Sequence, residues 1–329
     1  MKSFVINKND AGQRLDKFVT KSVGGLPQSL MYKFIRTKKI KLNGKRAEPS
    51  VILNEGDLVE MYIKDAFFSP PEDDTGALFD ITPKLDILYE DENIILLNKR
   101  PGVLVHEDEE GRDNTLLMHL KAYLVSRGEY DPSAEASFAP ALCNRIDRNT
   151  GGIVIGAKNA AALREMNGMI REGKVSKYYL CAVHGIMPKR EDILKAYLRK
   201  DSRTNTVDIS DKQKQGYREI VTGYRVLAQK RGDSLLEVRL YTGRTHQIRA
   251  HLSHIGHPLV GDGKYGQNRD DRRLGYKYQA LYSYKVAFDN GGEGVLGYLD
   301  RRSFSLPRDS VWFCADFFKP DNDGAIKNG

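Results

Sequence analysis

The sequence predicts an α+β protein, with a mixed, largely antiparallel sheet and flanking helices, preceded by a small basic α/β domain. Predicted strands follow one another more often than they alternate with helices, which disfavours a parallel sheet. The first 65 residues hold 13 Lys or Arg against 7 Asp or Glu and so carry most of the formal net charge of +8. A proline-rich, acidic segment then interrupts the apolar pattern at residues 66–83.

Composition sets broad limits on the protein's class. A chain of 329 residues with 40% hydrophobic and 29% charged residues is typical of a folded protein of about two domains. We expect domains at 1–65 and 84–329, joined by a linker at 66–83. The positive charge favours a polyanionic partner such as nucleic acid. Three widely spaced cysteines and short apolar runs predict no disulfide framework, no membrane span and a cytoplasmic location.

The N-terminal domain has clear element signals. Apolar residues at helical spacing follow Arg14, and a second helix is expected to begin at Pro27. The pair Asn43-Gly44 predicts a tight hairpin turn, and residues 57–63 predict a strand. Helix, helix and hairpin in this order resemble the S4 RNA-binding domain.

That resemblance implies that basic side chains of this domain bind folded RNA. Seen alone, a run of charges more often only keeps a domain soluble. A cationic helix joined to a cationic hairpin favours RNA binding instead. The candidate RNA contacts are Arg14, Lys33, Arg36, Lys38, Lys39, Lys45 and Arg46.

The second domain is expected to mix strands and helices. Apolar patterns and turn residues indicate their positions. Strands are predicted at 85–99 (two), 152–158, 174–185 and on both sides of the turn at 231–233, and helices at 115–127, after Asn159 and at 246–255.

One stretch, CNRIDRNTGG at residues 143–152, places a single carboxylate, Asp147, between Arg145 and Arg148. The two arginines are expected to keep this acid ionised, because a nearby cation favours a charged carboxylate. In extended backbone Arg145 and Asp147 share a face, while Ile146 turns inward. The glycine pair permits a sharp bend or a close approach of RNA. Seen alone, such a string is more often a surface ion-pair network.

Three other patterns give weak signals. GDGKYG at residues 261–266 has the glycines of a dinucleotide site but no helix pattern after it, so we interpret it as a turn. Four histidines lie between residues 246 and 257, but no neighbouring Glu or Cys supports a metal site. A conventional glycosidase would need a second carboxylate beside Asp147, and its sequence neighbours supply none.

Two later motifs give Asp147 a context. KVSKYYLCAVHG, at 174–185, places Tyr179 two residues after Lys177, and GRTHQIRAHL, at 243–252, opens a predicted helix. Together with NRIDRNTGG, in this order, they resemble the three motifs of the RluA family of RNA pseudouridine synthases. The likeness covers about residues 84 to 300 and implies the pseudouridine synthase fold, for which an S4 domain is a usual companion.

The resemblance implies a catalytic role for three residues. Asp147 would attack the uracil base, attack the sugar or act as a general base. Tyr179 would stack on the base and is a candidate general base at C5, and Arg244 would pair with Asp147. Arg145 would fill the space left by the flipped nucleotide. The other implied RNA contacts of this domain are Arg148, His246, Gln247 and Arg249, and the last three could instead only brace the site.

Physical chemistry supports this assignment. A stacked uridine must be extruded before its atoms can be reached, at a cost of a few kcal/mol. A guanidinium group can stack in the gap, and an aromatic ring contributes about 1 to 3 kcal/mol for each stacked base. Because the isomerisation keeps every atom and moves no electrons to an acceptor, we expect no metal or other cofactor.

The chain differs from the usual family pattern at two positions beside Asp147. The family commonly has His where this chain has Asn144, and Ser where it has Gly151. These differences concern substrate specificity more than activity. We expect a monomeric enzyme that isomerises uridines in structured RNA, with large-subunit ribosomal RNA as the expected substrate and transfer RNA as the alternative. An inactive RNA-binding regulator and a glycosylase that removes uracil are the rival interpretations.

Overall fold

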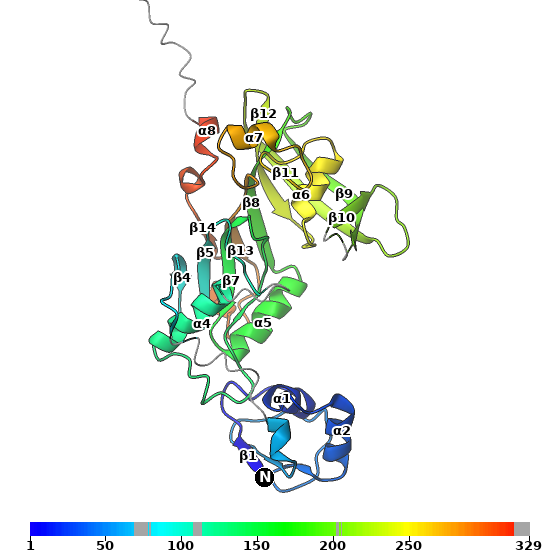
Figure 1. The fold of residues 1–329 in the computed structure, drawn as a ribbon, viewed down its shortest axis with the longest axis vertical. Coiled ribbons are helices and arrows are strands. Elements are labelled where there is room, and N and C mark those ends of the chain that lie inside the picture. Colours follow the sequence, from blue (N-terminus) through cyan, green and yellow to red (C-terminus); the bar gives the residue numbers. More distant parts are fainter. Residues whose placement is uncertain (69–77, 79, 108–113, 202–203, 205, 319–329) are drawn as a thin grey trace, which may run out of the picture.

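The computed structural model describes residues 1–68, 78, 80–107, 114–201, 204 and 206–318. A small unit with two helices lies at one end of the molecule, and a large sheet with its helices forms the rest (Figure 1). Most of the predicted linker and the tail after Phe318 lie outside the described residues. The domain boundaries at 65 and 83 therefore stay a prediction.

The N-terminal unit packs two helices on a three-stranded antiparallel sheet in the order β1-β3-β2. Its elements are β1 (Lys2–Val5), α1 (Leu15–Ser22), α2 (Gln28–Arg36), β2 (Ile40–Leu42), β3 (Leu58–Met61) and the short 3-10 turn η1 (Asp65–Phe68). The two helices confirm the sequence prediction. The strand β1 was not predicted, because it is short and largely exposed and so lacks a buried alternation.

Each helix of this unit buries one apolar face and leaves its cations outside. Phe18 of α1 and Ile35 of α2 are almost fully buried, and burial of such a side chain contributes about 1.5 to 3 kcal/mol. At the predicted turn, Asn43 and Gly44 both have positive φ, 51° and 73°. The hairpin is only one bridge long, because β2 pairs with β3 instead.

The larger unit is built on an eleven-stranded sheet in the order β10-β9-β11-β12-β8-β13-β7-β5-β4, with β14 beside β13 and β6 beside β7. Its strands are β4 (Ile87–Glu90), β5 (Ile94–Lys99), β6 (Ala141–Leu142), β7 (Gly151–Ala157), β8 (Val175–His184), β9 (Glu191–Asp201), β10 (Thr206–Ser210), β11 (Arg218–Lys230), β12 (Asp233–Leu240), β13 (Leu281–Phe288) and β14 (Ser303–Ser305). Every pairing is antiparallel except that of β7 with β13, which confirms the predicted mixed sheet.

Two helices, α4 (Leu116–Ser126) and α5 (Ala160–Arg171), cover opposite faces of the half of the sheet that contains β5. Alternate residues of β5 point to opposite faces of the sheet. Leu96 packs in one core with Met166 of α5, while Leu97 packs in another with Leu120 of α4. This burial on both faces explains why β5 is an unbroken apolar run.

The parallel pairing of β7 and β13 explains the glycine pair of CNRIDRNTGG. Gly152 has φ of +111°, and a Cβ built there would lie 2.1 Å from the carbonyl oxygen of Ser283. A Cβ on Gly151 would lie 2.3 Å from the ring of Tyr282. The two glycines therefore let β13 approach β7, whereas the sequence had suggested a sharp bend or a close approach of RNA.

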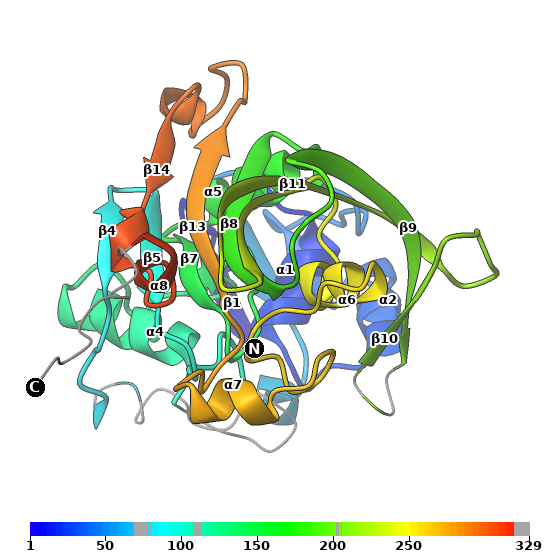
Figure 2. The ribbon, with the colours of Figure 1, turned by 90° about the horizontal axis from the view of Figure 1, so that it is seen from above.

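Five strands of the larger unit were not predicted: β6, β9, β10, β13 and β14. Seen from above, β9 and β10 lie on the side of the molecule opposite β4 and β14, and β9 and β11 arch over the helix α6 (Gln247–His254) (Figure 2). Six of the eleven residues of β9 are exposed, so its hydrophobic pattern is weak. The remaining short helices are α7 (Arg269–Arg273), η2 (Gly297–Leu299), η3 (Arg308–Ser310) and α8 (Ala315–Phe318).

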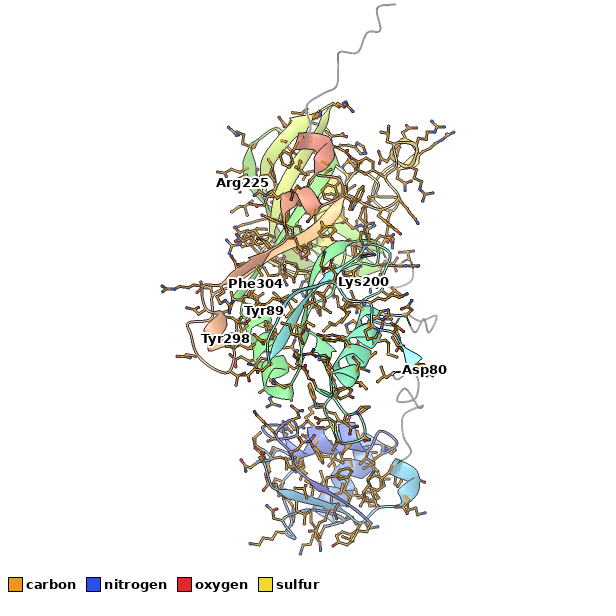
Figure 3. The ribbon with its side chains drawn as sticks, turned by 90° about the vertical axis from the view of Figure 1, so that its left-hand side faces the viewer. Asp80, Tyr89, Lys200, Arg225, Tyr298 and Phe304 are labelled. Atoms are coloured by element: carbon orange, nitrogen blue, oxygen red, sulfur yellow. The ribbon has the colours of Figure 1, made fainter. Side chains whose placement is uncertain are left out.

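Aromatic side chains join β4 to β14 on the side shown in Figure 3. The rings of Tyr89 and Phe304 have centroids 4.5 Å apart, and the Arg302 guanidinium lies 5.2 Å and 5.0 Å from them. The Tyr298 hydroxyl donates to the Asp91 carboxylate at 2.5 Å. These contacts attach the segment after β13 to the edge of the sheet.

The loop before β6 connects the two units through polar contacts. Asn9 donates to the Glu135 carboxylate at 2.6 Å, and Gln13 donates to the Ser137 hydroxyl at the same distance. The Ser137 hydroxyl in turn donates to Asp10 at 2.5 Å. Asn9 also accepts a hydrogen bond from the backbone N–H of Ala160, at the first turn of α5. The N-terminal unit thus docks on the larger one through side chains that the sequence did not single out.

The three cysteines are free thiols. Cys181 and Cys314 are buried, and Cys143 is partly buried. Burial raises the pKa of all three thiols, to about 12 for Cys143 and Cys314. They therefore remain protonated at neutral pH. Among the described residues, no helix is both long enough and apolar enough to span a membrane.

Candidate active site

Asp147 lies in the loop between β6 and β7, at the wall of a pocket of about 810 Å³. The pocket is lined by this loop, by Lys177 and Tyr179 of β8, and by the segment from Gly243 to Arg249. The Asp147 side chain is 25% exposed. The three sequence motifs therefore meet at one concave site, although 90 residues separate the end of the first from the start of the last.

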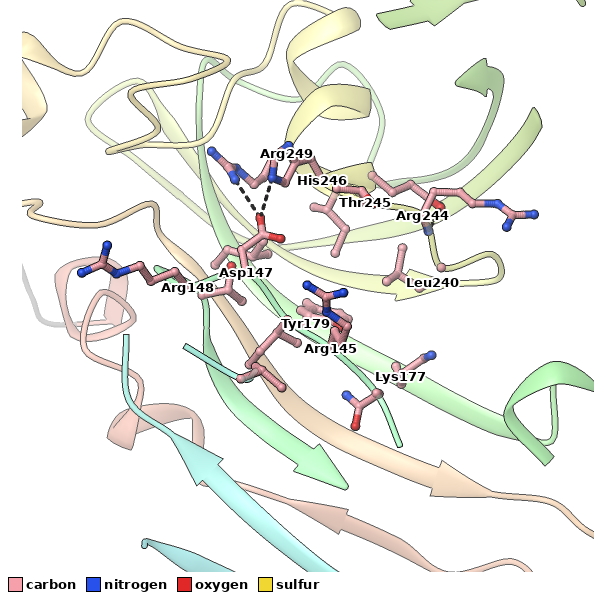
Figure 4. A pocket seen from close by; sticks show the side chains of 18 of the residues that line it. Arg145, Asp147, Arg148, Lys177, Tyr179, Leu240, Arg244, Thr245, His246 and Arg249 are labelled. Carbon is pink, nitrogen blue, oxygen red and sulfur yellow. Dashed lines mark hydrogen bonds and ion pairs between the residues drawn. The ribbon is translucent and has the colours of Figure 1, made fainter. Parts of the chain in front are cut away.

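The cation that holds Asp147 is Arg249. Its Nη1 donates to Oδ2 of Asp147 at 2.7 Å (Figure 4). The other carboxylate oxygen, Oδ1, accepts no hydrogen bond from the described residues. Burial alone would lower the pKa of Arg249, but hydrogen bonds and charges of Asp262 and Asp147 raise it, so the guanidinium keeps its charge.

The expected pairing of Arg244 with Asp147 is wrong in this structure. Arg244 is exposed and precedes α6, and its side chain extends away from Asp147 in Figure 4. Arg249 lies in the first turn of α6 and is only 7% exposed. The sequence could not choose between the two arginines, because the choice depends on where the helix begins.

Arg145 and Arg148 do not brace the carboxylate as the sequence suggested. The Arg148 Nε donates to the carbonyl oxygen of Gly102 at 3.2 Å, and the ion pair of Asp147 is made with Arg249. Both flanking arginines are exposed and line the pocket. Ile146 packs into two hydrophobic cores, as its expected inward orientation requires.

Tyr179 lies in the wall of the pocket and is 5% exposed. Burial, helped by the negative charge of Asp147, raises the pKa of its hydroxyl to about 12. A phenol with this pKa keeps its proton at neutral pH. The ring is thus well placed to contact a base, whereas the predicted role as general base would first require the pKa to fall.

Arg249 also binds a second carboxylate, that of Asp262. The sequence predicted only a glycine-rich turn at this residue. Oδ2 of Asp262 accepts from Nε of Arg249 at 2.7 Å, and Oδ1 accepts from Nη2 at 2.8 Å. The Tyr265 ring lies 5.2 Å from the same guanidinium. The only available sequence signal was an acid between two glycines.

His246 and Gln247 have different environments. His246, which has φ of +53°, places Nε2 3.8 Å from the Asp147 carboxylate and Nδ1 2.8 Å from the Tyr265 hydroxyl. Burial, together with neighbouring cations, lowers its pKa. Gln247 is 2% exposed and its amide bonds within the protein to Thr242, Thr222 and backbone groups. Of the two roles that the sequence left open, Gln247 therefore has that of a brace and not that of an RNA contact. Arg249 is a brace as well, because it pairs with Asp147.

Lys99 was also missed. It is 1% exposed, and its ammonium donates to the carbonyl oxygens of Arg100, Val103 and Arg148 at 3.1, 2.9 and 2.9 Å. Burial lowers its pKa to about 7, partly offset by Asp147. A lysine at an inward position of β5 was the available signal.

The predicted RNA contacts of the N-terminal unit lie outside this pocket. All seven are exposed. Arg14 pairs with Asp16 at 2.6 Å, Arg46 pairs with Glu48 at 3.5 Å, and the Lys39 ammonium lies 5.1 Å from the Phe34 ring centroid. Lys33, Arg36, Lys38 and Lys45 complete the exposed set.

Known proteins resemble this chain over most of its length. Residues 93–254 match the family model described as RNA pseudouridylate synthase, and residues 13–59 match the S4 domain. An uncharacterised RNA pseudouridine synthase of Mycoplasma genitalium is 33% identical, with 87% of this chain and 88% of the relative covered. The ribosomal large subunit pseudouridine synthase C of Escherichia coli K12 is 30% identical, with 89% and 90% covered.

The fold is similar to that of the human protein described as RNA Pseudouridylate Synthase Domain Containing 1, with a TM-score of 0.54 at 24% identity. That match covers 71% of this chain and 90% of the human one. The chain belongs to the RNA pseudouridine synthase family, with an S4 domain at its N-terminal end. It is an isomerase that acts on uridine in RNA.

Proposed function

We propose that this enzyme converts specific uridines of large-subunit ribosomal RNA to pseudouridine, through a flipped nucleotide and Asp147. The observation that carries this proposal is the state of the carboxylate. One oxygen of Asp147 is fixed by Arg249, while the other accepts no hydrogen bond from the described residues and lines an open pocket. A charged, oriented and accessible oxygen is what attack or proton transfer requires.

The pocket can receive an extruded base. Extrusion from a stacked RNA costs a few kcal/mol, and contacts in the pocket must offset this cost. The Tyr179 ring offers a stacking face worth about 1 to 3 kcal/mol. Arg145 is exposed at the rim, where its planar guanidinium can take the place of the departed base.

The reaction balances without an added reagent. The bond between N1 and C1′ breaks, the uracil turns in the pocket, and C5 bonds to C1′. C5 then loses its proton while N1 gains one, so substrate and product have the same atoms. Asp147 acts through its free oxygen on the base, on the sugar or as a proton acceptor. Because Tyr179 is protonated at neutral pH, we assign it first to stacking and hydrogen bonding.

Ribosomal RNA is the proposed substrate for two reasons. The Escherichia coli relative is described as a ribosomal large subunit enzyme, and the S4 unit exposes a set of cations suited to the phosphates of structured RNA. Transfer RNA is the alternative substrate. Pseudouridine mapping of total RNA from cells with and without the gene distinguishes the two.

The test of the chemistry is tritium release from RNA that carries 5-tritiated uridine. Asp147→Asn is expected to abolish release while RNA binding changes by less than about twofold, because a transition-state group is removed and the binding surface is kept. Asp270→Asn is the matched control, since its side chain is 84% exposed and lies away from the pocket. A wild-type rate in Asp147→Asn would contradict the mechanism.

The same assay separates the rival functions. An RNA-binding regulator would release no tritium with the wild-type protein. A glycosylase would liberate free uracil and leave an abasic site, which chain cleavage by mild base would reveal. Pseudouridine in the recovered RNA, with no free uracil, is the expected result.

A further inference from the structure

Arg249 binds two carboxylates at once, one through two hydrogen bonds and the other through a single one. Its Nε and Nη2 edge binds both oxygens of Asp262, while only Nη1 reaches Asp147. A bidentate bond of this kind fixes the plane of a guanidinium group. The orientation of Arg249 is therefore set by Asp262, and Asp147 is bonded through Nη1 alone.

Asp262 is itself rigidly placed. Its side chain is fully buried, and Oδ1 also accepts from the backbone N–H groups of Lys264 and Tyr265 at 2.9 and 3.2 Å. The preceding residue, Gly261, donates its backbone N–H to Asp271 at 2.7 Å. His184 in turn contacts the Asp271 carboxylate at 3.1 Å. This chain of contacts extends from the end of β8 to the carboxylate that holds Arg249.

The charges explain why such an arrangement matters. Two carboxylates share one guanidinium, so the positive charge of Arg249 is divided between them. A guanidinium paired with Asp147 alone could bind both of its oxygens side-on. Such a pair would occupy Oδ1, the oxygen that the proposed reaction uses.

We propose that Asp262 is a positioning residue that restricts Arg249 to a single bond with Asp147 and so keeps the reacting oxygen of Asp147 free. This inference rests on the proposed function of Asp147. Asp262, the acid of GDGKYG, would thus orient Asp147 through Arg249 and would not contact the substrate.

Asp262→Asn tests the proposal with little change of shape. The amide oxygen can still accept from the backbone N–H groups, but the amide nitrogen cannot accept from Arg249. The kcat for tritium release is expected to fall about 100-fold, as a displacement of about 1 Å at a reacting group can produce. The KM for RNA should stay within about twofold, because the RNA surface is unchanged.

A readout on Arg249 itself separates this role from a general loss of structure. The Nε proton of Arg249, held by a buried carboxylate, should exchange slowly in the ¹⁵N spectrum of the wild-type protein. In Asp262→Asn this signal should shift or be lost, while the melting temperature and RNA affinity remain near those of the control Asp270→Asn. An unchanged kcat, or an unchanged Arg249 signal, overturns the proposal.

A second variant decides the question if Asp262→Asn does not fold. Arg249→Lys keeps one positive charge but cannot bind Asp262 in a bidentate manner. It should lose at least as much kcat as expected for Asp262→Asn, and a wild-type kcat would overturn the proposal. If the wild-type enzyme itself released no tritium, the proposed function would fail instead, and the Arg249 spectrum would still report on its geometry.

Discussion

The ammonium group of Lys99 lies 2.9 Å from the carbonyl oxygen of Arg148 and ties β5 to the loop that carries Asp147. It also bonds to the carbonyl oxygens of Arg100 and Val103, in the turn after β5. One buried cation thus joins two loops at the pocket wall. The position of the Asp147 carboxylate depends on this lysine, because Asp147 and Arg148 are adjacent in the chain.

We predict that Lys99→Met lowers kcat by about 10- to 100-fold, because the Asp147 loop loses its charge-assisted bonds and the carboxylate is no longer held in place. RNA affinity should change little. Lys195→Met is the control, since Lys195 is an exposed lysine of β9. Single-turnover tritium release measures the effect, and an unchanged rate would show that the anchor is not needed.

The same lysine predicts a pH dependence of stability. Its folded pKa of about 7 lies below the ordinary 10.5, so between these values the unfolded chain binds more protons than the folded one. The free energy of unfolding is therefore not reduced by Lys99 above pH 10.5, where both states are neutral. It falls as the pH drops from 10.5 to about 7, because the unfolded chain takes up the proton first. The wild type should gain stability relative to Lys99→Met as the pH rises from 7 to 10. Urea unfolding at several pH values measures this difference, and a constant difference would contradict the prediction.

We predict that Tyr179→Phe keeps RNA affinity within about twofold, since the ring and its stacking face remain. The free enzyme holds its proton up to a pKa of about 12, so the pH profile of kcat/KM should show no ionisation of Tyr179 between pH 6 and 9. The profiles of wild type and Tyr179→Phe should therefore be parallel, whatever the fall in rate. If the wild-type pH profile showed a change of slope in this range that Tyr179→Phe lacks, the pKa of Tyr179 would be lowered in the functioning enzyme and Tyr179 would act as a base.

Deletion of residues 1–65 should weaken RNA binding and reduce its dependence on salt. Counterion release scales with the number of phosphates contacted, so fewer cations give a shallower slope of log K against log salt. The full-length variant Arg36→Ala/Lys38→Ala/Lys39→Ala is the control for folding, since these side chains are exposed. It should show the same trend to a smaller extent. An unchanged salt slope in both proteins would remove the RNA-binding role of this unit.

We predict that Gly152→Ala strongly destabilises the protein, by about 3 kcal/mol or more, because a Cβ there would overlap the backbone of Ser283. Gly173→Ala is the matched control. Gly173 also has positive φ, but a Cβ there would meet nothing within 4 Å. It should cost about 1 kcal/mol for the backbone conformation alone. Similar losses in urea unfolding would show that β13 can move aside.

Patterns local in sequence predicted much of the fold. Asn159 caps its helix as expected, and the turn at Arg231-Gly232 has two positive φ values. The strand β9 escaped prediction because more than half of its side chains are exposed. Strands of this kind are specified by their neighbours in the sheet more than by their own residues.

The site was predicted only in part, for a related reason. Asp147 and Tyr179 lie in the pocket as the motifs implied. The choice of Arg249 over Arg244 depends on the start of α6, and the roles of Lys99 and Asp262 depend on partners distant in the sequence. The available signals were a lysine at an inward position of β5 for Lys99 and an acid between two glycines for Asp262.

The raised thiol pKa values described above make the enzyme convenient to label. Cys181 and Cys314 are buried, Cys143 is partly buried, and all three thiols stay protonated at neutral pH, so maleimide dyes should react with them slowly in the native state. A cysteine introduced at exposed Lys38 could then carry a fluorophore without prior removal of the native ones. Such a probe would report the arrival of RNA at the N-terminal unit while tritium release reports the chemistry in the pocket.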